Sequence, residues 1–159
     1  MTTTATSFEE PRMEIRRAAP PLHRALVTLG NQVELDPRLR ELVNLRASIL
    51  NGCAYCIDMH TKTASGAGES EQRLHAVAAW HEAPFFDDKE RAALALTDAV
   101  TLINDGHVPR DVWEEASAHF EPDERRSVSS TEGAKLLLLL APWPGAGHYR
   151  GSHTARERA

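Results

Sequence analysis

The sequence has no long hydrophobic run, no excess of positive charge and only two cysteines among its 159 residues. Its longest uninterrupted apolar stretch, Leu136 to Ala141, is far shorter than the ~20 residues that a membrane-spanning helix needs. The formal net charge of −5 gives no electrostatic reason to expect nucleic acid or an anionic membrane surface as a partner. The acidic, Thr-rich stretch Met1 to Glu10 lacks the basic and then apolar pattern of a secretory signal. We therefore expect a cytoplasmic protein, in a compartment where thiols stay reduced.

A pattern typical of β-strands is also missing, because no segment sustains an alternation of apolar and polar residues with period two. The Pro, Gly, Asp and Ser residues instead predict helices that begin near Pro20-Pro21, Asp36-Pro37, Cys53, Ser70, Asp87, Val108-Pro109 and Pro122-Asp123. The sequence thus predicts an all-α fold, a compact bundle of about six or seven helices. We place this single domain at residues 12–141, with disordered tails at 1–11 and 142–159.

Helix boundaries are best marked in three places. Asp36-Pro37 combines a capping side chain with a proline suited to the first turn, and Asn51-Gly52 is a typical stop. Asp87 followed by Glu90 fits a capping box, and we expect its helix to run to about Asn104. Helical spacing predicts these inward-facing residues: Leu39, Leu42, Val43, Ile49, Leu50, Leu74, Val77, Ala78, Val112, Trp113, Ala116 and Phe120.

Both cysteines lie in one short segment that also contains a histidine. On a helix, Cys53, Cys56 and His60 stand at i, i+3 and i+7, which places them on one stripe. The positive end of the helix dipole favours a thiolate at Cys53, and His60 can accept a proton from Cys56 one turn away. Reduction of a peroxide needs such a set, namely an attacking thiolate, a group that moves protons and a second thiol that resolves the sulfenic acid.

Other interpretations of the Cys pair fit the sequence less well. Cys53, Cys56 and His60 could supply three zinc ligands, but no fourth Cys or His has suitable spacing. A c-type haem needs His directly after the second Cys, where Ile57 stands. A thioredoxin fold needs βαβ units, and the sequence shows none. We therefore expect no metal and no organic cofactor.

Residues 41–48 and 51–62 closely resemble the alkylhydroperoxidase D-like branch of the carboxymuconolactone decarboxylase family. Residues 71–74 and 79–86 also look like that family, and the resemblance extends over roughly 19–120. It implies an all-helical homo-oligomer, a trimer or hexamer, that reduces hydrogen peroxide or organic hydroperoxides with a CxxC pair. It further implies a lipoyl- or thioredoxin-type dithiol as reductant.

The resemblance also implies roles for four residues. The second cysteine, Cys56, would attack the peroxide and Cys53 would resolve it, while His60 and Glu41 would form a proton relay, partly through water. Helix-terminus electrostatics alone would instead favour Cys53 as the more acidic thiol. Some family members carry a histidine between the cysteines where this chain has Tyr55, whose hydroxyl could serve instead.

The chain departs from the family near its end. After Glu124 it shows no match to the family's last helix, as an altered reading frame would produce, and this places the assembly in question more than the active site.

Two other functions stay open: a lyase like the family's namesake, which does not require a CxxC pair, and a non-enzymatic redox sensor that uses the same disulfide. The histidines outside the Cys segment share no spacing, and we interpret them as surface or cap residues.

Overall fold

The computed structural model describes residues 15–32, 35–125 and 127–128. Its α-helices, in chain order, are α1 (Ile15–Ala18), α2 (Pro20–Asn31), α3 (Pro37–Leu50), α4 (Ala54–Gly66), α5 (Glu71–Ala76), α6 (Asp88–Thr101) and α7 (Arg110–His119). A 3₁₀ turn, η1 (Val77–Ala79), follows α5, and residues 122–125 are again helical. The described residues contain no strand, so the predicted all-α fold is confirmed. The predicted tails, 1–11 and 142–159, lie outside the described residues.

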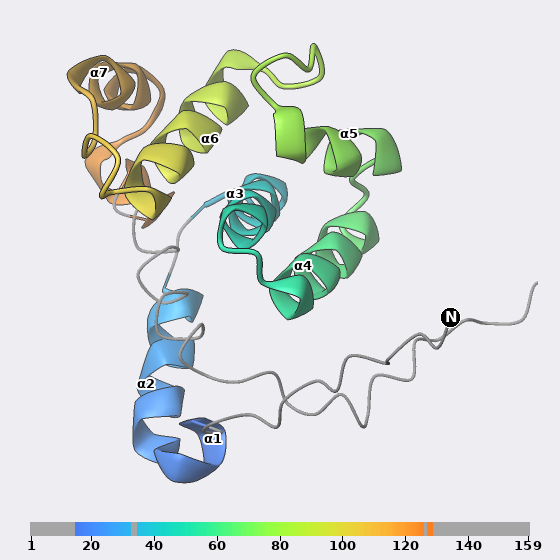
Figure 1. Ribbon diagram of the computed structural model, residues 1–159, viewed down its shortest axis with the longest axis vertical. Coiled ribbons are helices and arrows are strands. Elements are labelled where there is room, and N and C mark those ends of the chain that lie inside the picture. Colours follow the sequence, from blue (N-terminus) through green and yellow to red (C-terminus); the bar gives the residue numbers. More distant parts are fainter. Residues whose placement is uncertain (1–14, 33–34, 126, 129–159) are drawn as a thin grey trace, which may run out of the picture.

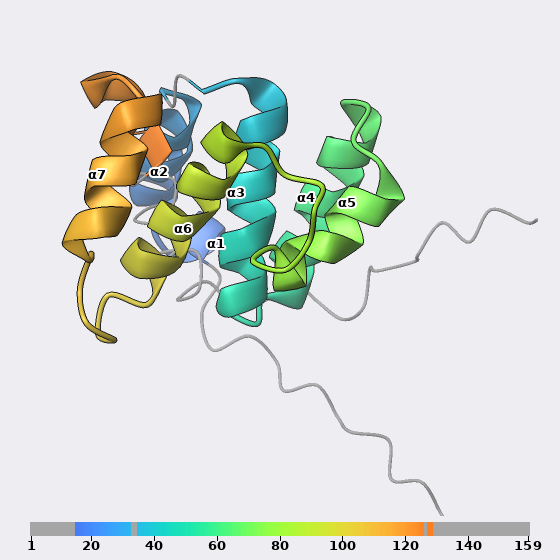
Figure 2. The same cartoon turned by 90° about the horizontal axis from the view of Figure 1, so that it is seen from above.

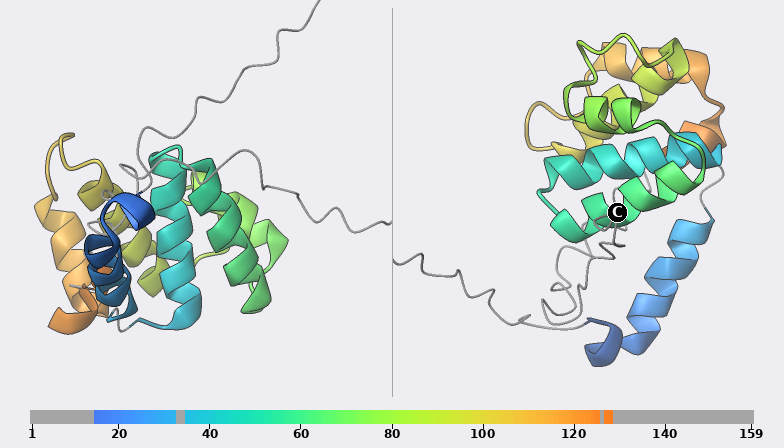
Figure 3. Two further views of the ribbon diagram at one scale, coloured as in Figure 1. Left: turned by 90° about the horizontal axis from the view of Figure 1, so that it is seen from below. Right: turned by 90° about the vertical axis from the view of Figure 1, so that its right-hand side faces the viewer.

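Helix α3 is the centre of the bundle. It contacts α4 on one side and α6 on the other, and α7 packs on the far side of α6. Figure 2 shows α7, α6, α3 and α4 side by side in that order, with α5 beyond α4. Helix α2 packs with α1 and is directed away from the α3–α7 body in Figure 1 and in the right-hand view of Figure 3. The body positions the cysteine segment, at the start of α4, against α3.

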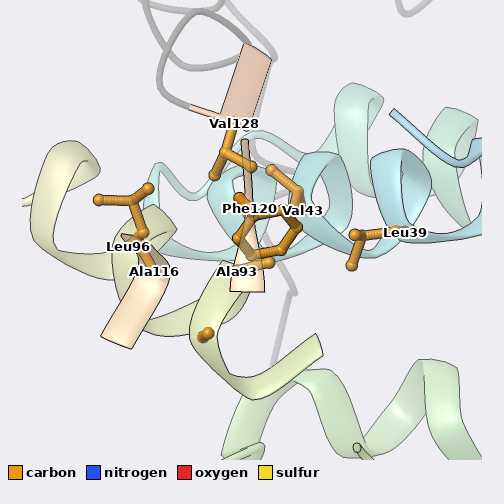
Figure 4. Packing of buried hydrophobic residues seen from close by; sticks show 8 residues of the cluster. Leu39, Val43, Ala93, Leu96, Ala116, Phe120 and Val128 are labelled. Atoms are coloured by element: carbon orange, nitrogen blue, oxygen red, sulfur yellow. The ribbon is translucent and has the colours of Figure 1, made fainter. Parts of the chain in front are cut away.

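Two clusters of buried apolar side chains fill the spaces beside α3. One lies between α3, α6 and α7 and is shown in Figure 4: Leu39, Val43, Ala92, Ala93, Leu96, Ala116, Phe120 and Val128. The other joins α3 to α4, α5, η1 and α6: Leu42, Leu45, Ala64, Leu74, Val77, Trp80, Phe86 and Leu94. Val128 is fully buried although it lies in the segment where the sequence stops resembling the family. This part of the segment therefore contributes to the core.

Local capping explains where the helices begin and end. Asp36 Oδ1 accepts the backbone N–H groups of Arg38 and Leu39 at 3.0 and 3.1 Å. Asp87 and Glu90 form the predicted capping box at the start of α6. Gly52 follows α3 with φ of 63°, a left-handed conformation that glycine adopts without steric cost. These boundary predictions are confirmed.

Four sequence predictions are wrong in detail. Helix α6 ends at Thr101 rather than near Asn104, because the following turn closes on Leu102, whose carbonyl accepts the N–H of Asp105 at 2.7 Å. Ala78 is exposed because the chain switches to a 3₁₀ turn there, which changes the helical phase. Trp113 is 46% exposed and lies under the guanidinium of Arg125, 5.3 Å from the ring centroid. Leu50, at the end of α3, is only half-buried, whereas Ile49 packs against the second apolar cluster as predicted.

A buried ion pair fixes α3 to its neighbours. Arg46 on α3 donates to both carboxylate oxygens of Asp98 on α6, at 2.6 and 2.8 Å. The same guanidinium donates to the carbonyl of Ala78 at 2.9 Å, and the indole of Trp80 donates to Asp98 at 3.1 Å. Because this network joins α3, the η1 turn and α6, it holds the helix that carries Glu41 in place.

Candidate active site

The cysteine pair lies at the N-terminus of α4. Cys53 is the N-cap residue, and its sulfur accepts the backbone N–H of Cys56 at 3.3 Å. The two residues form a disulfide, with their Cα atoms 5.3 Å apart. The turn at Gly52 brings the chain from α3 into α4, and the N–H of Cys53 bonds to the carbonyl of Ser48 at 3.0 Å. Cys53 is partly exposed, whereas Cys56 is buried, with 8% of its surface exposed.

A carboxylate from α3 contacts the histidine of the cysteine helix. His60 Nδ1 lies 2.8 Å from Glu41 Oε2, and these side chains are only 13% and 8% exposed. The residues are 19 positions apart in sequence, and the packing of α4 on α3 brings them together. His60 is one turn after Cys56 on the same helix. Since Nδ1 contacts Glu41, Nε2 is the other ring nitrogen through which His60 could exchange a proton.

The surroundings of Glu41 favour its charged form. Burial raises the pKa of this carboxyl. The hydrogen bond and charge of His60, the charge of Arg40 and a hydrogen bond from Asn44 together lower the pKa by more than burial raises it. The pKa of Glu41 therefore lies below its ordinary value. The Arg40 guanidinium is 3.7 Å from Glu41 Oε1. Glu41 is therefore ionised at neutral pH and is suited to accept a hydrogen bond from Nδ1 of His60.

Sequence reasoning missed Asn44 and Arg40 as partners of Glu41. Asn44 follows Glu41 by three positions on α3, is 8% exposed, and hydrogen-bonds to its carboxylate. A polar residue between Val43 and Leu45, in a stretch that is apolar on both sides, was the available signal.

Two other side chains of the cysteine segment face outward. Tyr55 is 41% exposed and Met59 is 37% exposed. Lys62 donates to Asp58 at 2.9 Å across one turn of α4. Beyond this segment, Trp80 and Phe86 are core residues. Within the described ranges, no group of three or more His, Cys, Asp or Glu side chains is arranged to hold a metal ion.

Among the helices that the structure describes, none has the length and apolar character required to cross a bilayer.

This all-α bundle, with a cysteine pair at a helix N-terminus and a Glu–His contact beside it, is similar to known proteins. A sequence model of the carboxymuconolactone decarboxylase family matches residues 20–99, about half of the chain. The chain belongs to this family. A crystal structure of a protein of unknown function from Agrobacterium tumefaciens, with a suggested role as the antioxidant defence protein AhpD, superposes with a TM-score of 0.77 and is 37% identical. The match covers 82% of this chain and 91% of that one, which places this chain in the alkylhydroperoxidase D-like branch.

Curated relatives agree with this family but carry no described activity. The uncharacterized protein YdfG of Bacillus subtilis is 40% identical over 93 residues, which are 58% of this chain and 63% of YdfG. The uncharacterized protein YnjA of Escherichia coli is 29% identical over 103 residues, which are 65% of this chain and 56% of YnjA. The chain thus matches less than two thirds of the length of either relative.

Proposed function

We propose that the protein is a thiol peroxidase that reduces hydrogen peroxide or organic hydroperoxides through a Cys53–Cys56 dithiol/disulfide cycle. The observation that carries the proposal is the 2.8 Å contact between His60 and the ionised Glu41, one turn from a cysteine pair that forms a disulfide. A buried carboxylate that orients a histidine beside two thiols is suited to moving the protons that a peroxide reduction requires.

The steps follow from the position of each group. The thiolate of Cys56 attacks the peroxide, the O–O bond breaks, and the leaving alkoxide or hydroxide takes a proton from His60, which gives an alcohol or water and a sulfenic acid. The thiol of Cys53 then attacks the Cys56 sulfur, which closes the disulfide and releases water. Glu41 stabilises the positive charge that His60 carries while it holds a proton.

The choice of Cys56 as the attacking thiol depends on two opposed arguments. The N–H of Cys56 bonds to the sulfur of Cys53, and this N-cap position favours a thiolate at Cys53. His60, however, lies one turn from Cys56, and a general base must be within reach of the proton that it removes. We assign first attack to Cys56 because His60, the nearby base, can remove the proton of this thiol in every turnover.

The main test is multiple turnover of a hydroperoxide with a dithiol reductant. We expect turnover with the native chain and none with either Cys53→Ser or Cys56→Ser. Peroxide should leave a trapped sulfenic acid on Cys56 in the Cys53→Ser variant. A single stoichiometric oxidation would indicate a redox sensor instead. Consumption of a γ-carboxymuconolactone-like substrate without peroxide turnover would indicate a lyase.

The same proposal includes a cytoplasmic location, a lipoyl- or thioredoxin-type reductant and a homo-oligomer. Support for an oligomer comes from α2, where Leu22 and Val27 are 46% and 48% exposed on a helix that packs mainly with α1. A helix of 12 residues is marginal by itself in water, so contact with other protein would stabilise it. Sedimentation at micromolar protein should give a trimer or hexamer, and a monomer would contradict this part of the proposal.

A further inference from the structure

The two cysteines differ in their exposure to solvent. Cys56 lies inside the first turn of α4 and is 8% exposed, whereas Cys53 precedes that turn and is partly exposed. The residues on either side of Cys53, Gly52 and Ala54, are both exposed. A Cβ atom added at Gly52 would meet no other atom within 4 Å. The approach to the disulfide is therefore open beside Cys53.

Access determines which sulfur of a disulfide an external thiolate attacks. The thiolate forms a mixed disulfide with the attacked sulfur and expels the other one. A hydroperoxide is small enough to reach a nearly buried sulfur, but a dithiol carried on a larger molecule needs an open approach. Oxidant and reductant therefore meet different sulfurs of the same pair.

We propose that the reducing dithiol attacks the sulfur of Cys53, entering over Gly52 and the exposed face of α4, and that Cys56 is released first. This inference rests on the proposed function for the origin of the disulfide, and it assigns the point at which the reductant binds. The outer face of α4 beside Cys53 carries two large exposed apolar side chains, Tyr55 and Met59, one turn apart. They form a ridge that an apolar dithiol contacts while its thiolate reaches Cys53.

The exchange balances in two steps. One thiol of the reductant gives its proton to His60, and the resulting thiolate bonds to the Cys53 sulfur. The Cys53–Cys56 bond breaks, and Cys56 leaves as a thiolate that takes that proton from His60. The second thiol of the reductant, as a thiolate, then attacks the reductant's own sulfur in the mixed disulfide, so that the reductant closes its own disulfide and the bond to Cys53 breaks. Cys53 leaves as a thiolate, stabilised by the N–H of Cys56 that already bonds to its sulfur at 3.3 Å. Two electrons thus pass from the dithiol to the cysteine pair. One of its protons reaches Cys56 through His60, and the proton of the second thiol goes to solvent while Cys53 stays a thiolate.

A monothiol separates the two directions of attack. The oxidised full-length protein is treated briefly with 2-mercaptoethanol and quenched with N-ethylmaleimide, and the tryptic peptide 47–62, which holds both cysteines, is sequenced by tandem mass spectrometry. We expect mercaptoethanol on Cys53 and maleimide on Cys56. The reverse pattern, or equal labelling of both sulfurs, overturns the inference. No peroxide is present, so the result is independent of whether the protein turns over peroxide.

The ridge is tested by comparing two dithiols. Tyr55→Ser combined with Met59→Ser should lower the rate constant for reduction by dihydrolipoamide about tenfold relative to that for dithiothreitol. A matched control is Leu102→Ser with Ile103→Ser, which removes two equally exposed apolar side chains from the α6–α7 turn and should leave the ratio unchanged. An equal loss with both dithiols overturns the ridge as a binding surface. A change in oligomeric mass with an unchanged ratio assigns the ridge to a subunit contact and also overturns it.

Discussion

Replacing Glu41 by Gln tests the central contact of the site with little change in shape. The Gln side chain can still accept a hydrogen bond from His60 Nδ1 and can still bond to Asn44, but it has no charge. The native carboxylate is 2.8 Å from the ring nitrogen and almost fully buried, so solvent screens the pair weakly. Loss of the charge on residue 41 therefore destabilises the protonated form of His60, which the proposed cycle needs.

The size of the effect follows from the strength of the hydrogen bond. A hydrogen bond to a charged group is worth about 1.5–3 kcal/mol, and one between neutral groups about 1 kcal/mol. The difference of about 0.5–2 kcal/mol corresponds to a loss of about 2- to 30-fold in the peroxidase rate constant. We expect circular dichroism and thermal unfolding to show that Glu41→Gln remains folded.

The assay is hydroperoxide turnover with a saturating dithiol, and Asp58→Asn is the matched control. It makes the same chemical change on α4, two positions before His60, but its partner is the exposed Lys62. We expect this control to keep its rate within about twofold, because exposed ion pairs contribute little. Full activity in Glu41→Gln, or equal losses in both variants, would refute the proposed role of the carboxylate.

Three further predictions concern stability. Arg46→Met should lower the free energy of unfolding in urea by about 3 kcal/mol, because it removes the positive partner of the largely buried Asp98 carboxylate, which keeps only a neutral donor in the indole of Trp80. Gly52→Ala should cost about 1–2 kcal/mol in the same assay, since Gly52 has φ of 63°. The lowered pKa of Glu41 means that its charge stabilises the fold above the ordinary pKa of 4.5, and that this contribution is lost as pH falls through the lower folded-state pKa. The difference in unfolding free energy between the native chain and Glu41→Gln, measured in urea titrations, should therefore shrink below about pH 4.5.

Each of these predictions has a control or a contradicting outcome. Arg110→Met removes an ion pair with Glu114 whose side chains are 90% and 61% exposed, and it should leave stability unchanged. Gly66→Ala lies in the last turn of α4, also with no atom within 4 Å of the new Cβ, and should be neutral or slightly stabilising. Equal effects of the two glycine variants would contradict the role given to backbone conformation. A pH-independent difference for Glu41→Gln would contradict the lowered pKa.

Features set by neighbouring residues could be predicted from the sequence. The caps at Asp36, Ser70 and Asp87 depend on backbone groups two or three residues away, and all three form as predicted. The position of Cys53 at a helix start follows from the Asn51-Gly52 stop in the same way. These interactions are local, so the amino-acid pattern contains most of the information.

Features that depend on packing between distant segments could not be predicted in this way. The contact of Glu41 with His60 spans 19 positions, and only the family resemblance indicated it. The pairing of Arg46 with Asp98 spans 52 positions, and no pattern indicated it. Trp113 has the spacing of a core residue, but it lies under a guanidinium at the surface because Ala116 and Phe120 already fill the contact with α3 and α6. Periodicity gives the face of a helix, but not how much of that face a neighbouring helix covers.

The N-cap role of Cys53 couples the chemistry of the site to the backbone of α4. The sulfur that takes part in the disulfide is also the acceptor for the first-turn N–H of Cys56. A free thiolate is a stronger acceptor than a disulfide sulfur, so reduction should tighten that hydrogen bond. Hydrogen–deuterium exchange at one amide would then report the oxidation state of the protein without any labelling of its sulfurs. The exchange rate of the Cys56 amide at the start of α4 would thus follow the oxidation state of the cysteine pair in the intact protein, also while oxidant and reductant are both present.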